Sequence, residues 1–408
     1  MHHVNKRVFW LVVAAILILP LLFDSIVVVP VTIQILISVI LALSYNMVLG
    51  QTGLLSFVHA IYFGFGGFAA VHAIRFASDG DLPVPVPFIP LFGAAMGLIM
   101  AATLASFTAR RTGMAFAMIT LCLVELVIAS GSILGRFYGG SVDRTLPPSF
   151  FGQNFVSDLS VYYVAVAWTV ASVIAMAWYA RSPLGRMANA VRDNADRVEF
   201  VSFNPRVIRF ASLSASGIFA GIAGSLFALT YEFVGGETIS FATSGNIIIM
   251  TFIGGIGHFS GPVIGAILVT LLQTLLGNYT QIWGLYLGFL FMSTVLFMPH
   301  GIAGLINRHL RFVQPGEWAK LFSPYLQLVI STVWAGIGFV GLLEMISYMN
   351  EAAVDEPILF LAGLQLDTSA VLPWSILAVI SLTGSWFLRR SLKQAQLAFK
   401  AVSSSEEV

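Results

Sequence analysis

The sequence predicts an all-α, polytopic membrane protein of about ten to twelve membrane-spanning helices, with glycine-broken helices lining a central path. Of its 408 residues, 58% are hydrophobic and only 10% are charged, and the mean hydropathy is +0.90. A soluble domain carries roughly 25% charged residues, so this composition indicates an integral membrane protein. Apolar blocks also follow one another along almost the whole chain.

Most of these blocks approach the roughly 20 residues that cross a bilayer. The first block begins directly after the basic residues Lys6 and Arg7 and has no small-residue cleavage site, so we expect a retained first helix. The single cysteine, Cys122, lies inside a block and cannot form an internal disulfide. The blocks are Val8–Phe23, Val31–Leu49, Gly53–Phe76, Phe88–Ala109, Met114–Leu134, Val161–Ala180, Val207–Tyr231, Phe241–Ile256, Pro262–Leu276, Ile282–Met298, Tyr325–Ile346 and Val371–Leu388.

Short loops rich in Lys and Arg indicate the orientation, because such loops tend to remain cytoplasmic. The basic groups are separated by even numbers of apolar blocks, so we expect both termini in the cytoplasm. Three arginines, Arg75, Arg136 and Arg144, fall on the opposite side and disagree with this rule. The loop Asn350–Thr368, which contains acidic residues and no Lys or Arg, is expected on the opposite side and agrees with the rule. The basic groups are Lys6 with Arg7, Arg110 with Arg111, Arg181–Arg209, Arg308–Lys320 and Arg389–Lys400.

A polar segment, residues 181–206, interrupts the apolar pattern. Ser182-Pro183 offers an N-cap followed by proline at the first helical position, and Asn204-Pro205 should end the helix. Two pairs of opposite charges four residues apart predict a solvated helical face. The segment is either an amphipathic linker on the membrane surface or a coupling helix that fits a partner's groove. Its candidate coupling residues are Arg186, Arg192, Asp193, Asn194, Asp196 and Arg197, with Arg192–Asp196 and Asp193–Arg197 as the two pairs.

Two apolar segments, Gly50–His59 and Gly254–Gly265, are interrupted by glycine, and each carries a serine and a histidine. Paired interruptions in the two halves of a transporter are typical of broken helices that line its path. The alternative is close helix packing, and the histidines His59 and His258 could simply satisfy backbone carbonyls. The candidate path residues are Gly53, Ser56, His59, Gly64, Gly66, Glu125, Gly254, Gly255, Gly257 and Gly261.

The sequence lacks the motifs of ATP hydrolysis and of common enzymes. Its four lysines, Lys6, Lys320, Lys393 and Lys400, lie outside any glycine-rich phosphate loop, and no Cys/His cluster has metal-ligand spacing. We therefore expect no enzymatic activity and no cofactor bound by this chain. Glu125 is the one carboxylate clearly central in an apolar block, where it could serve a proton relay or a hydrogen bond within the bundle.

A series of short motifs follows in order from about Leu41 to Leu305. They are Gly50-Gln51-Thr52-Gly53-Leu54-Leu55-Ser56, the Met114–Glu125 span, Gly139-Gly140-Ser141, Ser182-Pro183-Leu184-Gly185-Arg186, Arg192-Asp193-Asn194, Ala220-Gly221-Ile222-Ala223-Gly224, Ile253-Gly254-Gly255-Ile256-Gly257, Gly261-Pro262-Val263-Ile264-Gly265-Ala266 and Met298-Pro299-His300-Gly301. Each motif alone is weak. In this order, they resemble the permease subunits of branched-chain amino-acid ABC importers.

The resemblance implies a bacterial inner-membrane subunit that pairs with a second permease subunit as a heterodimer. It also implies two cytoplasmic ATP-binding subunits, which would bind ATP and magnesium, and a periplasmic substrate-binding protein. Contact with membrane lipid is implied, and none with nucleic acid. Residues 1–307 would form the permease domain with the coupling loop 181–206. Residues 308–388 would add two extra spans, and residues 389–408 a basic cytoplasmic tail.

The sequence departs from the family pattern at Val58, at Ser202-Phe203-Asn204 and at Val234-Gly235-Gly236, which lacks the expected proline. The spans after Arg308 have no recognised counterpart. The solute therefore stays open between branched-chain amino acids and urea or short amides. A secondary carrier that uses Glu125, and an interaction module without transport, also remain as alternatives.

Overall fold

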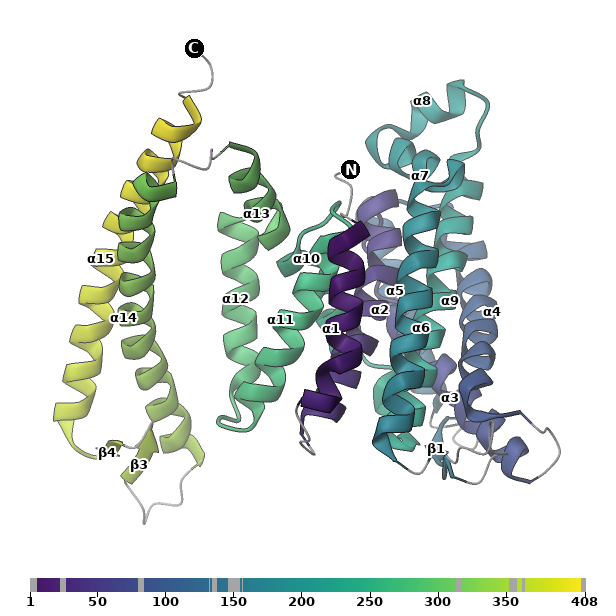
Figure 1. Ribbon diagram of the computed structural model, residues 1–408, viewed down its shortest axis with the longest axis horizontal. Coiled ribbons are helices and arrows are strands. Elements are labelled where there is room, and N and C mark those ends of the chain that lie inside the picture. Colours follow the sequence, from purple (N-terminus) through teal and green to yellow (C-terminus); the bar gives the residue numbers. More distant parts are fainter. Residues whose placement is uncertain are drawn as a thin grey trace. The chain divides into compact units, whose positions relative to one another are not determined.

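Helices form most of the chain, with two short antiparallel strand pairs, in a computed structural model (Figure 1). The structure describes residues 6–22, 27–79, 84–131, 133, 138–145, 155, 157–312, 318–351, 358–361 and 364–404. The predicted all-α class is confirmed.

Each of the twelve apolar blocks forms a helix. These helices are α1 (Lys6–Leu22), α2 (Val28–Thr52), α3 (His59–Ser78), α4 (Ile89–Thr108), α5 (Gly113–Gly131), α6 (Asp158–Arg181), α9 (Pro205–Tyr231), α10 (Phe241–Gly254), α11 (Ser260–Gly277), α12 (Trp283–Phe297), α14 (Trp318–Glu351) and α15 (Val371–Ser404). The other elements are η1 (Val86–Phe88), β1 (Gly140–Ser141), α7 (Pro183–Asp193), α8 (Ala195–Phe200), β2 (Phe233–Val234), η2 (Gly236–Thr238), α13 (Gly301–Phe312), β3 (Ile358–Leu361) and β4 (Leu364–Asp367).

Nine helices within the described residues are long and apolar enough to cross a membrane. A tenth span results if α12 and α13, which are bent by 48°, count as one. The helices α1 and α10 are apolar but have only 17 and 14 residues. The chain is thus a multi-pass membrane protein, and its long spans number at or just below the lower end of the predicted range.

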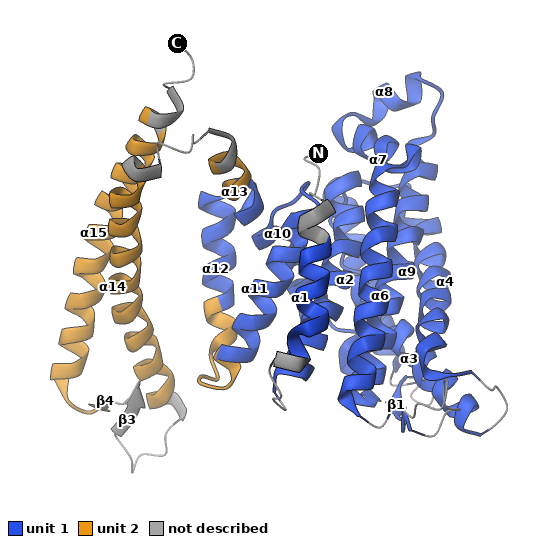
Figure 2. Ribbon diagram, in the orientation of Figure 1, with its two compact units in different colours: residues 1–275, 287–304 blue, residues 276–286, 305–408 orange. Residues whose placement is uncertain are grey.

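The chain divides into two compact units (Figure 2). Unit 1 comprises residues 1–275 and 287–304, and unit 2 comprises residues 276–286 and 305–408. The boundary after residue 304 lies close to the predicted start of the C-terminal extension. The roles predicted for the two parts stay predictions.

Helix α9 lies at the centre of unit 1, where 72% of its apolar window is buried against α2, α3 and α4. Small residues allow this contact. A Cβ added at Gly66 of α3, at Gly97 of α4 or at Gly221 of α9 would overlap backbone atoms of a facing helix. The three helices therefore touch backbone to backbone, as small residues permit in membrane proteins.

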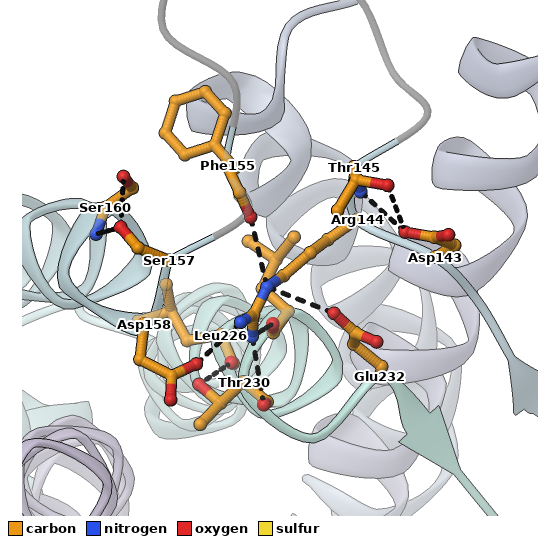
Figure 3. Close-up of polar contacts among 11 residues, drawn as sticks. Asp143, Arg144, Thr145, Phe155, Ser157, Asp158, Ser160, Leu226, Thr230 and Glu232 are labelled. Carbon is orange, nitrogen blue, oxygen red and sulfur yellow. Dashed lines mark hydrogen bonds and ion pairs between the residues drawn. The ribbon is translucent and has the colours of Figure 1, made fainter. Parts of the chain in front are cut away.

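The end of unit 1 opposite α7 is closed around the buried side chain of Arg144 (Figure 3). Its Nη2 atom lies 2.6 Å from Oδ1 of Asp158, and its Nε atom lies 3.0 Å from Oε1 of Glu232. It also donates hydrogen bonds to the backbone carbonyls of Phe155, Leu229 and Thr230. At least five acceptors among the described residues thus surround one guanidinium, which is how a buried charge is stabilised.

Arg144 joins three parts of the chain at that end. Asp158 begins α6, and Glu232 ends α9 in the left-handed conformation with a φ of 54°. Nearby, Arg75 donates to the carbonyl oxygen of Ser141 at 3.1 Å. Two of the three arginines that disagree with the charge rule are therefore held by local acceptors. Arg136 lies outside the described residues.

Unit 2 contains the two extra helices, α14 and α15, which pack together and are connected through the β3–β4 hairpin. The hydroxyl groups of Ser331 and Ser391 lie 2.6 Å apart between them. The Tyr286 hydroxyl donates to Oε1 of Glu344 at 2.6 Å, so this intramembrane carboxylate has a partner. Asp355 and Glu356 of the acidic loop lie outside the described residues.

Candidate path and coupling helix

Helix α7 begins as predicted. The Ser182 hydroxyl accepts a hydrogen bond from the N–H of Gly185 at 3.2 Å, and Pro183 occupies the first helical position. The apolar face of α7 packs through Ala188 and Val191 against Ile208, near the start of α9. Helix α7 therefore rests on the central helix of unit 1, at the end far from Arg144.

The four charged residues of the predicted pairs are exposed as expected, but the members of each pair do not lie in one helix. The helix is interrupted at Asn194, whose backbone is extended with a φ of −161°, and whose Oδ1 caps α8 by accepting from the N–H of Arg197 at 3.0 Å. An Asn side chain favours a cap over a helix interior because it bonds the backbone itself. Among the described residues, Arg192 instead forms an ion pair with its neighbour Asp193 at 3.1 Å.

The side chain of Arg192 reaches from α7 to both glycine-interrupted segments. Its Nη1 atom donates to the carbonyl oxygen of Gly50 at 2.5 Å. A Cβ added at Gly53 would lie 2.9 Å from its Cγ atom, and one added at Gly257 would lie 3.8 Å from Nη1. One predicted coupling residue is therefore close to two predicted path residues.

The first glycine break, residues 53–58, is fixed by three helices. Gly53 ends α2 in the left-handed region with a φ of 71°, where its lack of a Cβ avoids strain. The N–H of Phe57 donates to the Thr120 hydroxyl of α5 at 3.2 Å. The carbonyl of Phe57 accepts from Ser244 of α10. Both backbone groups of Phe57, in the middle of the break, are therefore satisfied by side chains of neighbouring helices.

Ser56 lies within this break and His59 directly follows it, and both are fully buried. The N–H of Ser56 donates to the Tyr45 hydroxyl at 3.3 Å, while its own hydroxyl has no hydrogen-bond partner among the described residues. The His59 ring lies edge-on to Tyr45, with centroids 4.8 Å apart. The backbone of Ser44 is near enough to interact with the ring, but neither ring nitrogen makes a well-directed hydrogen bond. These are polar groups within the helix bundle.

The second break, residues 255–259, separates α10 from α11. Gly255 has a φ of 117°, and a Cβ there would overlap the carbonyl oxygen of His300. A Cβ added at Gly254 would overlap the carbonyl oxygen of Gly261, and one added at Gly261 would overlap the carbonyl oxygen of Gly255. Gly257, with a φ of 86°, is exposed and has only Arg192 near its missing side chain. Most glycines of this segment therefore allow close backbone packing, whereas Gly257 has room for a side chain.

The remaining path candidates lie apart from these two breaks. Gly64 of α3 faces Ile239, and Gly66 faces the backbone of Gly221 in α9. Glu125 is exposed on α5. The coupling candidates Arg186 and Asp196 are exposed on α7 and α8. Whether the path candidates line a route for solute stays a prediction.

Sequence reasoning missed the uncharged polar residues that hold the breaks. Thr120 and Ser244 bind Phe57, and Gln273 of α11 donates to Asn246 of α10 at 2.7 Å. The signal was a cluster of Thr, Ser and Asn at the start of the apolar block 241–256. Within the described residues, no group of three His, Cys, Asp or Glu side chains is placed to hold a metal ion.

These features define a class: a multi-pass helical membrane protein whose surface helix reaches two broken segments, as in membrane permeases. Residues 27–298 match the family described as the permease component of the branched-chain amino acid transport system. The chain belongs to this family.

Several named permeases are similar to this chain. The high-affinity branched-chain amino acid transport system permease protein LivM of Escherichia coli is 28% identical over 306 residues, covering 68% of this chain and 70% of LivM. The corresponding LivH of E. coli is 24% identical, covering 65% of this chain and 90% of LivH. A probable LivH of Methanocaldococcus jannaschii is 24% identical, covering 69% of this chain and 90% of that LivH. No solved structure gives a significant match.

Proposed function

We propose that this chain is a membrane-spanning subunit of an ATP-driven ABC importer that translocates branched-chain or related amino acids across the bacterial inner membrane. Family membership supports the transport role, and the names of LivM and LivH support the solute class. ATP and magnesium are assigned to separate ATPase subunits, because this sequence contains no phosphate-binding loop.

The proposed complex contains a second permease subunit, two cytoplasmic ATP-binding subunits and a periplasmic substrate-binding protein. LivM and LivH of E. coli are both named as permease proteins of a high-affinity system, which supports the pairing of two related chains. In this complex, both termini and α7 face the cytoplasm. The basic residues of the 181–209 segment support that orientation.

The observation that carries the proposal is the reach of Arg192 from α7 to Gly50, Gly53 and Gly257. An ATPase that moves α7 would move this guanidinium, and with it the ends of both glycine breaks. The breaks can respond because their backbone is outside the regular hydrogen bonding of the helices. In this proposal, movement of α7 is passed through Arg192 to the backbone of both glycine breaks.

Reconstitution tests the proposal. The chain, its partner permease and both ATPases are placed in proteoliposomes with ATP inside and the binding protein outside, and entry of labelled leucine is measured. We expect entry only when both ATP and binding protein are present. Entry of urea or acetamide in place of leucine would favour the short-amide alternative. Entry driven by a proton gradient without ATP, and lost in Glu125→Gln, would identify a secondary carrier.

A further inference from the structure

Helix α5 is the least covered long span of unit 1. Only 22% of its apolar window is buried, against 72% for both α3 and α9. Its covered stripe, Phe116, Thr120 and Val124, recurs every four residues and faces the rest of unit 1. Through Thr120, this stripe also holds the first glycine break. The opposite face of α5 is open.

The open face carries a carboxylate. Met114, Met118, Cys122, Glu125 and Leu126 are all exposed along it. Glu125 follows the first residue of α5 by twelve positions and precedes its last by six, so it is well inside the span. It makes no hydrogen bond or ion pair with any described residue.

Lipid is a poor neighbour for this face. A charged side chain near the centre of a spanning helix costs roughly 2.5–3.5 kcal/mol on insertion scales, and such residues almost always face protein or a water-filled cavity. Methionine, by contrast, adapts to irregular protein surfaces. The face therefore combines one group that lipid disfavours with two side chains suited to a protein contact.

The extra hairpin of unit 2 is an unsuitable occupant. In α14, the window Leu321–Met349 contains one charged residue, Glu344, whose carboxylate already accepts from Tyr286. In α15, the first charged residue is Arg389, near the end of the apolar block. Neither helix offers a cation to a carboxylate in the middle of a span.

We propose that the open face of α5 is the surface on which the second permease subunit docks, with Glu125 facing a polar or cationic side chain of that subunit. This inference rests on the proposed function, which supplies a second permease. Thr120 of the covered stripe binds Phe57 in the first glycine break. A partner docked on the open face of α5 would therefore be separated from that break only by α5 itself. The Glu125 carboxylate then lies in the interface between the two permease subunits and not in lipid.

Cys122 is the single cysteine of the chain and lies on this face, three residues before Glu125, so it provides a built-in probe. The chain is labelled with benzophenone maleimide and assembled in membranes with a cysteine-free partner permease and the ATPases. Illumination should join it to the partner permease, seen as a product of their combined mass. The matched control is Ile99→Cys in a Cys122→Ser background, because Ile99 is 57% exposed at the middle of α4.

We expect the control to give lipid adducts and no partner product. Lipid adducts at Cys122, or links to peptides of α14 or α15, in a complex that still imports leucine would overturn the docking inference alone. Purification of the chain without any second permease would overturn the proposed function and this inference together. A second measurement compares Glu125→Leu with Glu125→Gln. Leu should lower recovery of the partner severalfold, whereas Gln, which keeps hydrogen bonding, should lower it less. Equal recovery with both variants would show that no polar group faces Glu125.

Discussion

The guanidinium of Arg192 in α7 donates a hydrogen bond to the carbonyl oxygen of Gly50, in the last turn of α2, at 2.5 Å. Carbonyls in the last turn of a helix lack helical partners, and a nearby cation also complements the helix dipole. One side chain thus ties a surface helix to the end of a membrane-spanning one. A linker lying on the membrane would not need this contact, so the proposed coupling role of α7 depends on it.

Arg192→Ala should reduce ATP-driven uptake about tenfold or more. A hydrogen bond to a charged group contributes about 1.5–3 kcal/mol, and 1.4 kcal/mol corresponds to a factor of ten. Complex assembly should be retained, because the side chain is partly exposed. The matched control is Arg111→Ala, an exposed arginine between α4 and α5 that lies outside the coupling segment. Uptake and stimulated ATPase activity are measured, and uptake within twofold of the unmodified protein would refute the coupling role.

Gly255→Ala and Gly257→Ala should fail in different ways. Both positions have positive φ, but only at Gly255 would a methyl group overlap backbone, the carbonyl oxygen of His300. We expect Gly255→Ala to lose most folded protein in size-exclusion chromatography. Gly257→Ala should fold, because its added Cβ would lie no closer than 3.8 Å to any atom beyond its chain neighbours, yet it should lose transport, because a side chain at a φ of 86° limits the backbone freedom of the proposed break. Normal uptake by Gly257→Ala would exclude a path role for that residue.

Arg144→Met should destabilise unit 1 without touching the proposed path. Removing one member of a buried ion pair costs about 3–5 kcal/mol, and we expect roughly 2–4 kcal/mol because the side chains of Asp158 and Glu232 are 58% and 39% exposed. The melting temperature of the purified chain should fall by about 5 °C or more. Asp143→Asn is the control, since that carboxylate accepts only from Thr145 among the described residues. An unchanged melting temperature for Arg144→Met would show that the pairs contribute nothing.

Truncation after Asn307 should leave substrate-dependent uptake measurable. Both glycine breaks and α7 lie in unit 1, whereas the removed residues belong to unit 2. Yield should decline, because Tyr286 loses its acceptor Glu344 within the spans. Uptake is measured per assembled complex. A complex that assembles fully and transports nothing would place α14 and α15 in the mechanism.

The positions of the helices were predictable because apolar length and proline or serine caps act locally. Ser182 caps α7 as expected, whereas Asn204, which was expected only to end a helix, caps α9. The interruption at Asn194 was not predictable from charge spacing. The Asn194 side chain can either face solvent within a continuous helix or cap a new helix that begins after it. The free energies of these two conformations differ by only about 1 kcal/mol.

The candidate site was predictable only in part, because its contacts are tertiary. Nothing in the spacing of Gly255 and Gly257 distinguishes a glycine packed against the backbone of His300 from one that has only the side chain of Arg192 near it. The inward reach of Arg192 depends on where α2 ends relative to α7. The isolated arginine Arg144 was visible as an exception to the charge rule, and its carboxylate partners explain the exception.

The backbone contacts among α3, α4 and α9 have a mechanical consequence. Helices that touch without intervening side chains have little room to slide or bend, so the three should move as one rigid unit. Near one end of α9, Ile208 packs against α7, and near the other end Arg144 binds the carbonyls of Leu229 and Thr230. A tilt imposed on α9 at Ile208 should therefore be passed along the helix to Leu229 and Thr230, the residues that Arg144 binds at its other end.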